Sequence, residues 1–546
     1  MSDGTNVTNG FEQPISKNFN KWLHCICIVT FDLEIGQALE SVFPKNVKLT
    51  KQEISNICYL AFPDSNSGCM GDTNFIIRLQ TTQGKKHLNQ EYEKYNSKCP
   101  TALQIDGSYY WGYVYFRQVK DITLPRGYFQ KSVVIISLLP FNNLFSKICS
   151  FIAPEYFRCG EVSLEAACCN IDQWPPPTPG ITQTLPLLGS NFTSTIPNSA
   201  SCTPDSSYVD NINLFEILQP VLSHLHLLWE LVLTSEPIVI MASSPTHCSS
   251  MVLALTRIIN PLQYCGDYRP YFTIHDSEFK QFTNRIQGPP PVIIGVTNPF
   301  FAKTLHHWPH TIRLAEDAVS IQNKYKLKKT APMKFIDNNP GVYTAYKSFL
   351  QKDKTIIKKI MNGVNSKRPN EVQSALLRRH LLELTQTFMI PLERYIASLM
   401  PLQKSISPFK AAPIPLPFNP DKFFASLEMA GPQLTTPIKG DWIGLYKRFF
   451  RSPNFKAWFH ERYAELTSKL QALHLEALAK ADLKDWVQGK PEVEVVDMII
   501  KMKNKINKCR ENDIPVSESI KQQLNQRLND ILSQLPDDLK NILQVS

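Results

Sequence analysis

Hydrophobic and polar positions alternate in short runs over the first 180 residues. Apolar runs separated by polar turns predict strands over 22–31, 57–62, 74–79, 109–118 and 129–138. The short connections favour antiparallel pairing of these strands. The helical spacing of Ile35, Leu39 and Val42 predicts a helix that ends before Pro44, and similar spacing predicts helices over 144–152 and 164–171. We therefore expect an α+β unit.

The alternation stops at about residue 174. The segment 174–180 reads WPPPTPG, and Ser, Thr, Pro and Asn dominate the chain up to about residue 210. A segment of this composition cannot bury enough apolar surface to offset the entropy lost when it becomes ordered. We expect it to be a linker between two folded units.

A second pattern begins at Leu214, where apolar residues recur at helical spacing as far as Val232. This predicts a core-facing helix that Pro220 kinks or splits. Short apolar runs predict strands over 238–241, 270–274 and 292–296, with a helix between the first two. The long connections imply parallel pairing with helices on the faces of the sheet, so we expect an α/β unit.

From about Tyr343 to the end of the chain, no run has a convincing strand pattern. Helical periodicity predicts helices over 372–388, 423–430, 442–450, 458–481, 493–508 and 518–535, interrupted by a proline-rich stretch over 408–420. The third unit is therefore expected to be helical.

The length agrees with this division, because 546 residues at ~150 per domain predict three or four units. The expected fold class is multidomain, α/β plus α+β, with an antiparallel sheet, a mostly parallel sheet and a helical tail. The predicted boundaries are a flexible N-terminus over 1–20, an α+β module over 21–180, a linker over 181–210, an α/β module over 211–342 and a helical module over 343–546.

Charge and composition exclude several classes of protein. The 58 Lys and Arg against 48 Asp and Glu give a net charge of +10, without the dense basic stripe of a dedicated nucleic-acid binder. The polar segment 1–20 lacks the apolar run of a secretory signal, and the apolar stretch 133–152 contains Pro140 and Lys147. Cysteines such as Cys25 and Cys27 lie in apolar runs, as buried thiols do. We expect a cytoplasmic protein with no nucleic-acid partner.

Motifs of enzyme chemistry are not found in the sequence. It contains no GxxxxGK[ST], HExxH, GxSxG, GxGxxG or CxxC, so we expect no cofactor, no metal and no covalent catalysis. The histidines at 306, 307 and 310 surround Pro309, which prevents a regular helix from presenting them as ligands. Basic runs over 324–329, 354–359 and 501–510 are interpreted as solvated faces, with an anionic membrane surface as the alternative.

Seven stretches, in order along the chain, resemble the DENN-domain proteins. They are FDLEIGQALESVFP (31–44), ICYLAFPDSNSGCMGDTNF (57–75), YYWGYVYFRQVKD (109–121), RGYFQKSVVIIS (126–137), EPIVIMASSP (236–245), NPLQYCGDYRPYFTIHDSEFKQF (260–282) and GPPPVIIGVTNPFF (288–301). The details FPDSNSGCMGD, PYFTIHDSEFK and VQSALLRRHLLELTQTF are similar to subfamily six of that family. The resemblance covers roughly 21–535, apart from the linker.

This resemblance implies a longin-like N-terminal domain, a central α/β DENN domain and a helical DENN tail. Members of the family are guanine nucleotide exchange factors for Rab GTPases, and subfamily six is associated with Rab fourteen on recycling endosomes. The implied protein is a catalytic regulator that promotes GDP release, peripheral on recycling endosomes, with a Rab GTPase as its partner. Exchange breaks no covalent bond, which agrees with a sequence that lacks enzyme motifs.

The resemblance also implies that the Rab lies between the longin-like and central domains. At the expected strand-to-helix turn, the candidate contacts are Asp32, Glu34, Gly36 and Gln37. After the loop between two strands, they are Arg126, Gly127, Gln130 and Lys131. On the central domain, they are Tyr268 and Arg269. Each of the first two groups has an alternative interpretation as an ordinary turn without a partner.

Two other functions remain open from the sequence. Related longin and DENN proteins of the folliculin kind accelerate GTP hydrolysis with an arginine, and Arg126 is the candidate for such a finger in a Rab or Arf GTPase-activating protein. A non-catalytic trafficking scaffold is the other alternative. The complete three-part DENN pattern favours exchange over both, although a fold does not determine a function.

Overall fold

The structure is a computed structural model of the whole chain. It describes residues 18–64, 69–81, 90–125, 127–198, 213–315, 326–328, 340–402, 406–430, 438–511, 514–536 and 539–540. Contacts divide the chain into two compact units. The first unit comprises 1–385 and 436–457, and the second comprises 386–435 and 458–546. Each unit is described by itself.

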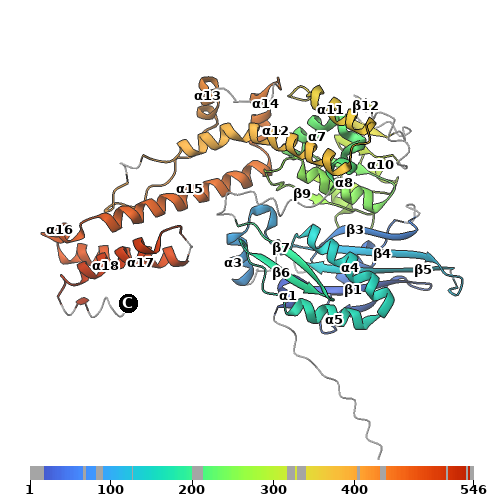
Figure 1. The fold of residues 1–546 in the computed structure, drawn as a ribbon, viewed down its shortest axis with the longest axis horizontal. Coiled ribbons are helices and arrows are strands. Elements are labelled where there is room, and N and C mark those ends of the chain that lie inside the picture. Colours follow the sequence, from blue (N-terminus) through green and yellow to red (C-terminus); the bar gives the residue numbers. More distant parts are fainter. Residues whose placement is uncertain are drawn as a thin grey trace, which may run out of the picture. The chain divides into compact units, whose positions relative to one another are not determined.

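The N-terminal part of the first unit is built on a five-stranded antiparallel sheet (Figure 1). Its strand order is β2-β1-β5-β4-β3. The strands are β1 (Cys25–Asp32), β2 (Gly36–Phe43), β3 (Gly71–Gln80), β4 (Tyr109–Lys120) and β5 (Tyr128–Ser137). The antiparallel sheet expected for this part is therefore confirmed.

Helices cover both faces of this sheet. The helix α4 (Asn142–Cys159) packs on β3, β4 and β5, and α5 (Glu161–Asp172) packs on α4. The helix α2 (Lys51–Leu60) packs on β2 and β3. Because both faces are covered, the first five residues of β1 are all buried, whereas a one-sided sheet buries alternate residues. Short helices α1 (Phe19–Trp22) and α3 (Gln90–Lys98) complete this part.

Two secondary-structure predictions in this part are wrong. The expected helix before Pro44 is the strand β2, which pairs with β1 from Ile26↔Phe43 to Asp32↔Gly36. The expected strand over 57–62 lies largely in α2, which Thr50 and Glu53 start with a capping box. Both runs are short and apolar, and periodicity in so short a run does not separate helix from strand.

The ordered chain also extends past both predicted ends of the first module. Phe19, in the segment 1–20 that is predicted to be flexible, is buried. In the predicted linker, β6 (Thr182–Leu187) and β7 (Ser190–Thr195) form a hairpin. Alternate residues of β6 face inward, so Leu185 and Leu187 are fully buried. Residues 1–17 and 199–212 lie outside the described residues.

The central part of the first unit has a six-stranded sheet of order β12-β13-β11-β8-β10-β9. Its pairs are parallel except β11 with β13, which confirms a mostly parallel sheet. The strands are β8 (Ile238–Met241), β9 (Asp267–Arg269), β10 (Val292–Val296), β11 (His310–Arg313), β12 (Lys326–Lys328) and β13 (Gly341–Thr344). The strand predicted over 270–274 lies three residues earlier, as β9.

Helices surround this sheet. Pro220 divides the predicted helix into α6 (Leu214–Leu218), a 3₁₀ segment over 219–224, and α7 (Leu225–Leu233), as expected. The helix α8 (Pro245–Arg257) follows β8, and the short helices α9 (Phe279–Phe282) and α10 (Phe301–Thr304) flank β10.

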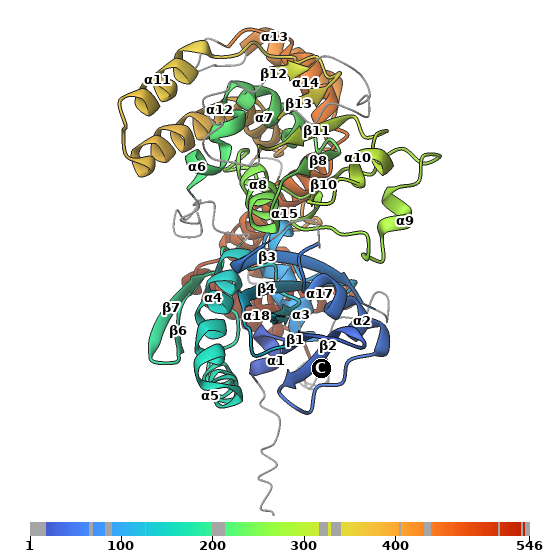
Figure 2. The ribbon, with the colours of Figure 1, turned by 90° about the vertical axis from the view of Figure 1, so that its right-hand side faces the viewer.

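The helix α8 also packs on β3 of the N-terminal sheet (Figure 2). The backbone N–H of Ile76 donates to the Ser249 hydroxyl at 3.3 Å, and the Thr246 hydroxyl donates to the Asn74 carbonyl at 2.9 Å. Since β3 is an edge strand, α8 covers backbone groups that would otherwise be open to another chain.

The remaining described elements are helices, as predicted. They are α11 (Lys354–Asn365), α12 (Asn370–Ser398), α13 (Pro420–Ala430), α14 (Trp442–Phe449), α15 (Pro453–Lys480), α16 (Leu483–Val487), α17 (Glu492–Glu511) and α18 (Glu518–Leu532). The second unit has its own apolar core around Leu478, Ile499 and Ile531. Among the described helices, none combines the length and the apolar character needed to cross a bilayer.

Candidate functional site

Two hairpin turns lie side by side at one end of the five-stranded sheet. The β1–β2 turn closes at Asp32↔Gly36, and the β4–β5 turn closes at Lys120↔Tyr128. Because β1 pairs with β5 at Thr30↔Lys131, the two turns are neighbours. We call residues 32–37, 119–125 and 127–131 the sheet-end surface. It contains seven of the candidate contacts, namely Asp32, Glu34, Gly36, Gln37, Gly127, Gln130 and Lys131.

Local hydrogen bonds hold the β1–β2 turn. The Asp32 carboxylate accepts from the backbone N–H groups of Glu34 at 2.8 Å and Ile35 at 3.0 Å. These bonds, that from Ile35 first, hold the pKa of Asp32 below its usual value. Gly36 has φ +80°, a conformation in which glycine has no steric penalty. The predicted strand-to-helix turn is thus a strand-to-strand turn.

The β4–β5 turn is held in a similar way. The Asp121 carboxylate accepts from the Thr123 backbone N–H at 2.9 Å, and Gly127, with φ +74°, bonds through its N–H to the Leu124 carbonyl at 2.9 Å. Both turns therefore satisfy their own polar groups within a few residues. Arg126 lies outside the described residues.

Apolar side chains project from both turns. Leu33 is 60% exposed and Ile35 is 75% exposed on the first turn, and Ile122 is 97% exposed on the second. Leu124, Val119 and Tyr128 are also exposed. Single exposed apolar residues are ordinary, but several on adjoining turns are typical of a protein-binding surface.

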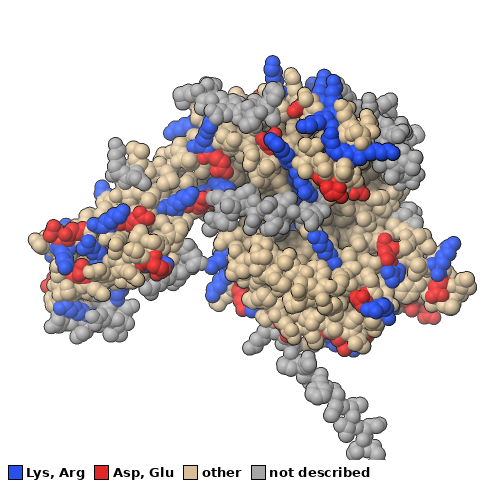
Figure 3. Space-filling model, viewed as in Figure 1, with Lys and Arg blue, Asp and Glu red and all other residues tan. Residues whose placement is uncertain are grey.

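Charged and amide side chains lie behind the turns. Lys131 bonds to the Glu40 carboxylate at 2.8 Å, and the Gln130 amide donates to the Gln118 side chain at 2.7 Å. Arg117 forms two bonds to Asp72, at 2.6 and 2.8 Å. Figure 3 shows charges of both signs at this end of the sheet, separated by uncharged atoms. The Gln130–Gln118 and Arg117–Asp72 pairs lie directly opposite each other on neighbouring strands and help to hold these strands in register beneath the turns.

Tyr268 and Arg269 lie elsewhere. Tyr268 accepts a hydrogen bond from Asn142 at 2.8 Å and packs against Trp111, near the start of β4. The strand β4 runs from Tyr109 to Lys120, so its two ends are roughly 36 Å apart at about 3.3 Å per residue. The structure therefore does not bring this pair together with the sheet-end surface.

Arg269 is only 1% exposed, and its contacts lie within the first unit. Its guanidinium bonds to Glu278 at 2.6 Å and to Asp267 at 2.6 Å. The Tyr109 hydroxyl donates to the other oxygen of Glu278 at 2.8 Å, and Arg78 pairs with Asp267. Arg269 therefore connects the central sheet to the N-terminal sheet within the first unit.

The sequence interpretation overlooked the exposed apolar residues of the turns. The signal was present, because Leu33 and Ile35 stand within DLEIG, and Ile122 and Leu124 stand within DITLPRG. An apolar residue in a tight turn between Asp and Gly has no core to face. Such residues are candidates for contacts with a partner.

No group of three His, Cys, Asp or Glu side chains suited to a metal ion gathers within the part of the chain that the structure describes. The histidines suspected in the sequence have other contacts. His310 Nδ1 lies 2.7 Å from the Thr344 hydroxyl inside the central sheet, and His306 Nδ1 lies 2.9 Å from the Lys303 carbonyl.

Comparison with known proteins gives two family matches. Residues 128–313 match the model of the DENN (AEX-3) domain, and residues 483–546 match that of the DENND6 C-terminal domain. The chain is 50% identical to Protein DENND6B of Homo sapiens over 547 residues, which covers 96% of this chain and 93% of that protein.

Two further relatives extend this match. The chain is 50% identical to Protein DENND6A of Gallus gallus over 552 residues, covering 96% of this chain and 93% of that protein. It is 31% identical to the Protein DENND6 homolog of Dictyostelium discoideum over 625 residues, covering 99% of this chain and 84% of that protein. The similarity thus extends over nearly the whole chain.

Proposed function

The chain belongs to the DENND6 group of the DENN-domain family, and from that premise we propose that it is a guanine nucleotide exchange factor for a Rab GTPase. It would promote GDP release without making or breaking a covalent bond. The sequence also resembles subfamily six, and on that basis we propose that the GTPase is Rab fourteen. We further propose that the protein is cytoplasmic and acts at the periphery of recycling endosomes.

The observation that carries the proposal is the sheet-end surface. Exchange requires a surface that binds nucleotide-free GTPase more tightly than nucleotide-bound GTPase. By linkage, binding of that surface weakens the affinity of the GTPase for its nucleotide by the same factor. The apolar side chains of the two turns supply area that a protein partner can cover, and the exposed Asp32 and Glu34 supply charges beside it.

The rigidity of the two turns favours such a role. Their backbone bonds are formed before any partner arrives, so binding orders little of the chain. Ile122 and Ile35 can then enter the partner surface at low entropic cost.

We also propose that the protein binds a membrane whose surface is anionic. Lys354, Lys358 and Lys359 are exposed on α11, and each basic group near an anionic leaflet contributes ~1 kcal/mol.

The direct test is release of a fluorescent GDP analogue from a panel of Rab GTPases at catalytic amounts of the full chain. We expect Ile122→Asp to slow release at least tenfold, about 1.4 kcal/mol, because it places a charge in the binding surface. Ile286→Asp is the matched control, since Ile286 is 95% exposed but lies on the segment before β10. Failure of the wild-type chain on every Rab, or equal losses in the two variants, would contradict the proposal.

Arg126 separates exchange from GTPase activation. For an exchange factor, Arg126→Ala slows GDP release and Arg126→Lys restores part of it, because either residue supplies a positive contact. For a GTPase-activating protein, single-turnover GTP hydrolysis falls by ~10³ on mutation, and Lys does not rescue the planar fork of the guanidinium. Stimulated hydrolysis without stimulated GDP release would overturn the exchange proposal, and binding without either activity would indicate a scaffold.

A further inference from the structure

We infer that a buried pair of histidines makes the packing of two helices of the first unit sensitive to acid. The pair consists of His226 on α7 and His380 on α12. Their Nε2 atoms lie 3.1 Å apart, and the rings meet edge to face with centroids 5.2 Å apart. The two residues are only 3% and 5% exposed. Both come before residue 386, so the contact lies inside the first unit.

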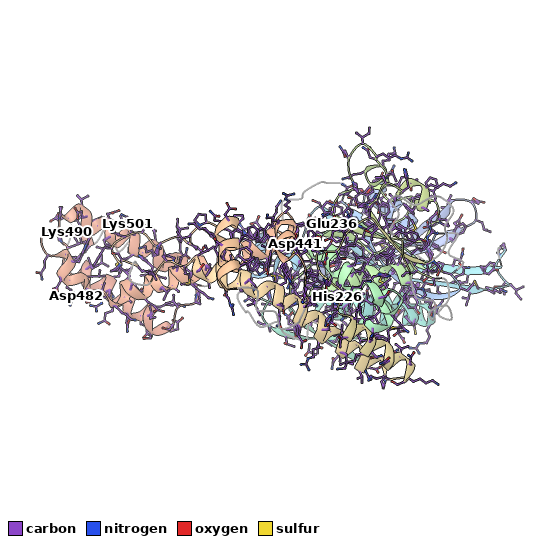
Figure 4. All side chains as sticks on the ribbon, turned by 90° about the horizontal axis from the view of Figure 1, so that it is seen from above. His226, Glu236, Asp441, Asp482, Lys490 and Lys501 are labelled. Atoms are coloured by element: carbon purple, nitrogen blue, oxygen red, sulfur yellow. The ribbon has the colours of Figure 1, made fainter. Side chains whose placement is uncertain are left out.

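The pair lies in the middle of a polar seam between α12 and the helices before β8. The helices α7 and α12 lie side by side in Figure 1 and in Figure 2, and Figure 4 labels His226 on α7. On one side of the pair, the Ser374 hydroxyl accepts the Phe215 backbone N–H at 3.1 Å. On the other side, Trp229 Nε1 donates to the Thr385 hydroxyl at 2.9 Å. Of these three contacts, only that of the histidines consists of groups that titrate near neutral pH.

The contact between the two rings needs a neutral acceptor. A hydrogen bond between two Nε2 atoms requires that one nitrogen donates a proton and that the other accepts it with a lone pair. When both rings are charged, both Nε2 atoms carry protons and the bond is lost. His226 Nδ1 is also buried and has no hydrogen-bond partner among the described residues. A positive charge on that ring therefore has no acceptor at Nδ1 to stabilise it.

Two carboxylates favour a charged pair, but burial outweighs them. Asp353, just before α11, raises the pKa of both rings, and Glu383, on α12, raises the pKa of His380. Burial is the larger cause and lowers the pKa of both rings, that of His226 to about 4, because the charged form loses its hydration. The pair is therefore neutral near pH 7.

The other polar groups around the pair do not favour a proton on it either. Lys352 lowers the pKa of His226 further, and its ammonium bonds to the Ser223 carbonyl at 3.0 Å. Asp353 already caps α11, because it accepts two backbone N–H groups of the first turn at 2.9 and 3.3 Å. His224, on the preceding 3₁₀ segment, is a further base and supplies no negative charge. Protonation of the pair thus places an uncompensated charge in the interior.

The direction of the pH effect follows from these protonation states. A histidine of the unfolded chain titrates near pH 6.5, whereas the packed pair takes up its protons only at lower pH. As the pH falls below about 6.5, the open form therefore binds more protons than the packed form. Opening of the seam becomes more favourable by up to about tenfold per pH unit for each histidine. The contribution of the pair to stability is full above about pH 6.5 and is lost in acid.

The pair thus acts as a switch that holds α12 against α7 near neutral pH and releases it in acid. The contacts of Ser374 and Thr385 on either side contain no group that titrates in this range, so the pH response lies at the pair. The helix α12 continues beyond Thr385 to Ser398, in the second unit. Acid therefore loosens the start of a helix that leads into that unit. This pH response goes beyond the proposed function, and exchange activity is not needed to test it.

Hydrogen exchange of the full chain at pH 7 and at pH 5, corrected for the intrinsic effect of pH on exchange, tests the switch. We expect the protection of amides over 374–385 to fall about tenfold more than that of the β5 amides, which serve as the internal reference. In His380→Gln this difference should shrink at least threefold, because the glutamine amide donates to His226 without titrating. His247→Gln is the matched control, since His247 is exposed on α8 and binds its proton alike in the packed and open forms.

The wild-type measurement decides whether the seam responds to acid, and the variants decide whether the pair is the cause. Equal changes over 374–385 and over β5 in the wild type, or the same pH response in the wild type and in His380→Gln, would overturn the inference. His226→Gln repeats the test from the other side of the contact and should shrink the response in the same way, so the test stands if one of the two variants does not fold. A response that His247→Gln reduces as much as His380→Gln does would also contradict the assignment to the pair.

Discussion

The two ends of the N-terminal sheet use similar residue types for opposite purposes. At the sheet-end surface, Asp32 and Asp121 satisfy backbone groups of their own turns, and apolar side chains remain open to solvent. At the other end, Arg269 pairs with Glu278, and both side chains are buried; Arg269 also pairs with the partly exposed Asp267. The same charged residue types can therefore shape an exposed turn or connect two buried layers, depending on whether their partners are local or distant.

This comparison predicts the largest loss at the buried end. Arg269→Met leaves Glu278 buried without its cation, which costs ~3–5 kcal/mol of unfolding free energy. Arg117→Met is the matched control, because Arg117 also bonds twice to a carboxylate but lies near the exposed end, 27% exposed, where such pairs contribute ~1 kcal/mol or less. Urea unfolding of both variants measures the difference. Equal losses would contradict the distinction between the two ends.

The second-largest expected effect is a difference between the two ends in how stability depends on pH. Burial raises the pKa of Asp276, beside Glu278, to about 7, whereas an unfolded aspartate titrates near 3.9. The folded chain thus binds an extra proton between these values, so this group's contribution is full below about pH 4 and is lost as the pH rises to about 7. Asp276→Asn removes that loss, and we expect it to stabilise the chain at pH 8 by a few kcal/mol.

Thermal unfolding of Asp276→Asn from pH 5 to pH 8, beside the wild-type chain, checks this prediction. Asp32→Asn at the exposed end serves as the control. Its pKa is lowered and not raised, so it stays ionised in the folded and the unfolded chain from pH 5 to pH 8, and its removal should not change the slope of the stability curve over that range. A variant at 276 that is less stable than wild type at pH 8 would show that the ionised carboxylate is favourable there.

The smallest expected effect is that of a substitution in the β1–β2 turn of the sheet-end surface. Gly36→Ala meets no neighbouring atom within 4 Å, but it must adopt φ +80°. We expect a loss of about 1 kcal/mol in unfolding free energy and a modest decrease in GDP release, since the turn is strained and not removed. Gly288→Ala is the control, because the added methyl group also meets open space there without a positive φ. If the rate of GDP release falls by more than the loss in unfolding free energy explains, the geometry of the turn itself contributes to binding of the partner.

Much of the fold could be predicted from local pattern. Alternation identified β4 and β5, apolar periodicity identified the helices from α12 onward, and Pro220 marked the break before α7. The errors fell where the local signal was short or polar. The strand β2 had helix-like spacing, and the β6–β7 hairpin lay within a Ser/Thr/Pro-rich segment. Pairing with β1 makes 36–43 a strand in place of a helix. Packing of Leu185 and Leu187 against α5 makes the β6–β7 hairpin ordered in place of a linker.

The candidate site, too, has some features that follow from local sequence and others that follow from tertiary structure. The local sequence sets the hydrogen bonds that Asp32 and Asp121 accept within their own turns and the positive φ angles of Gly36 and Gly127. It nevertheless predicted a helix, and not a strand, after the first turn. It also determined the family, through motifs spread over the chain. It did not determine that the two turns are neighbours or that Arg269 is buried. Those facts follow from strand pairing and packing between residues far apart in the chain, which only the tertiary structure decides.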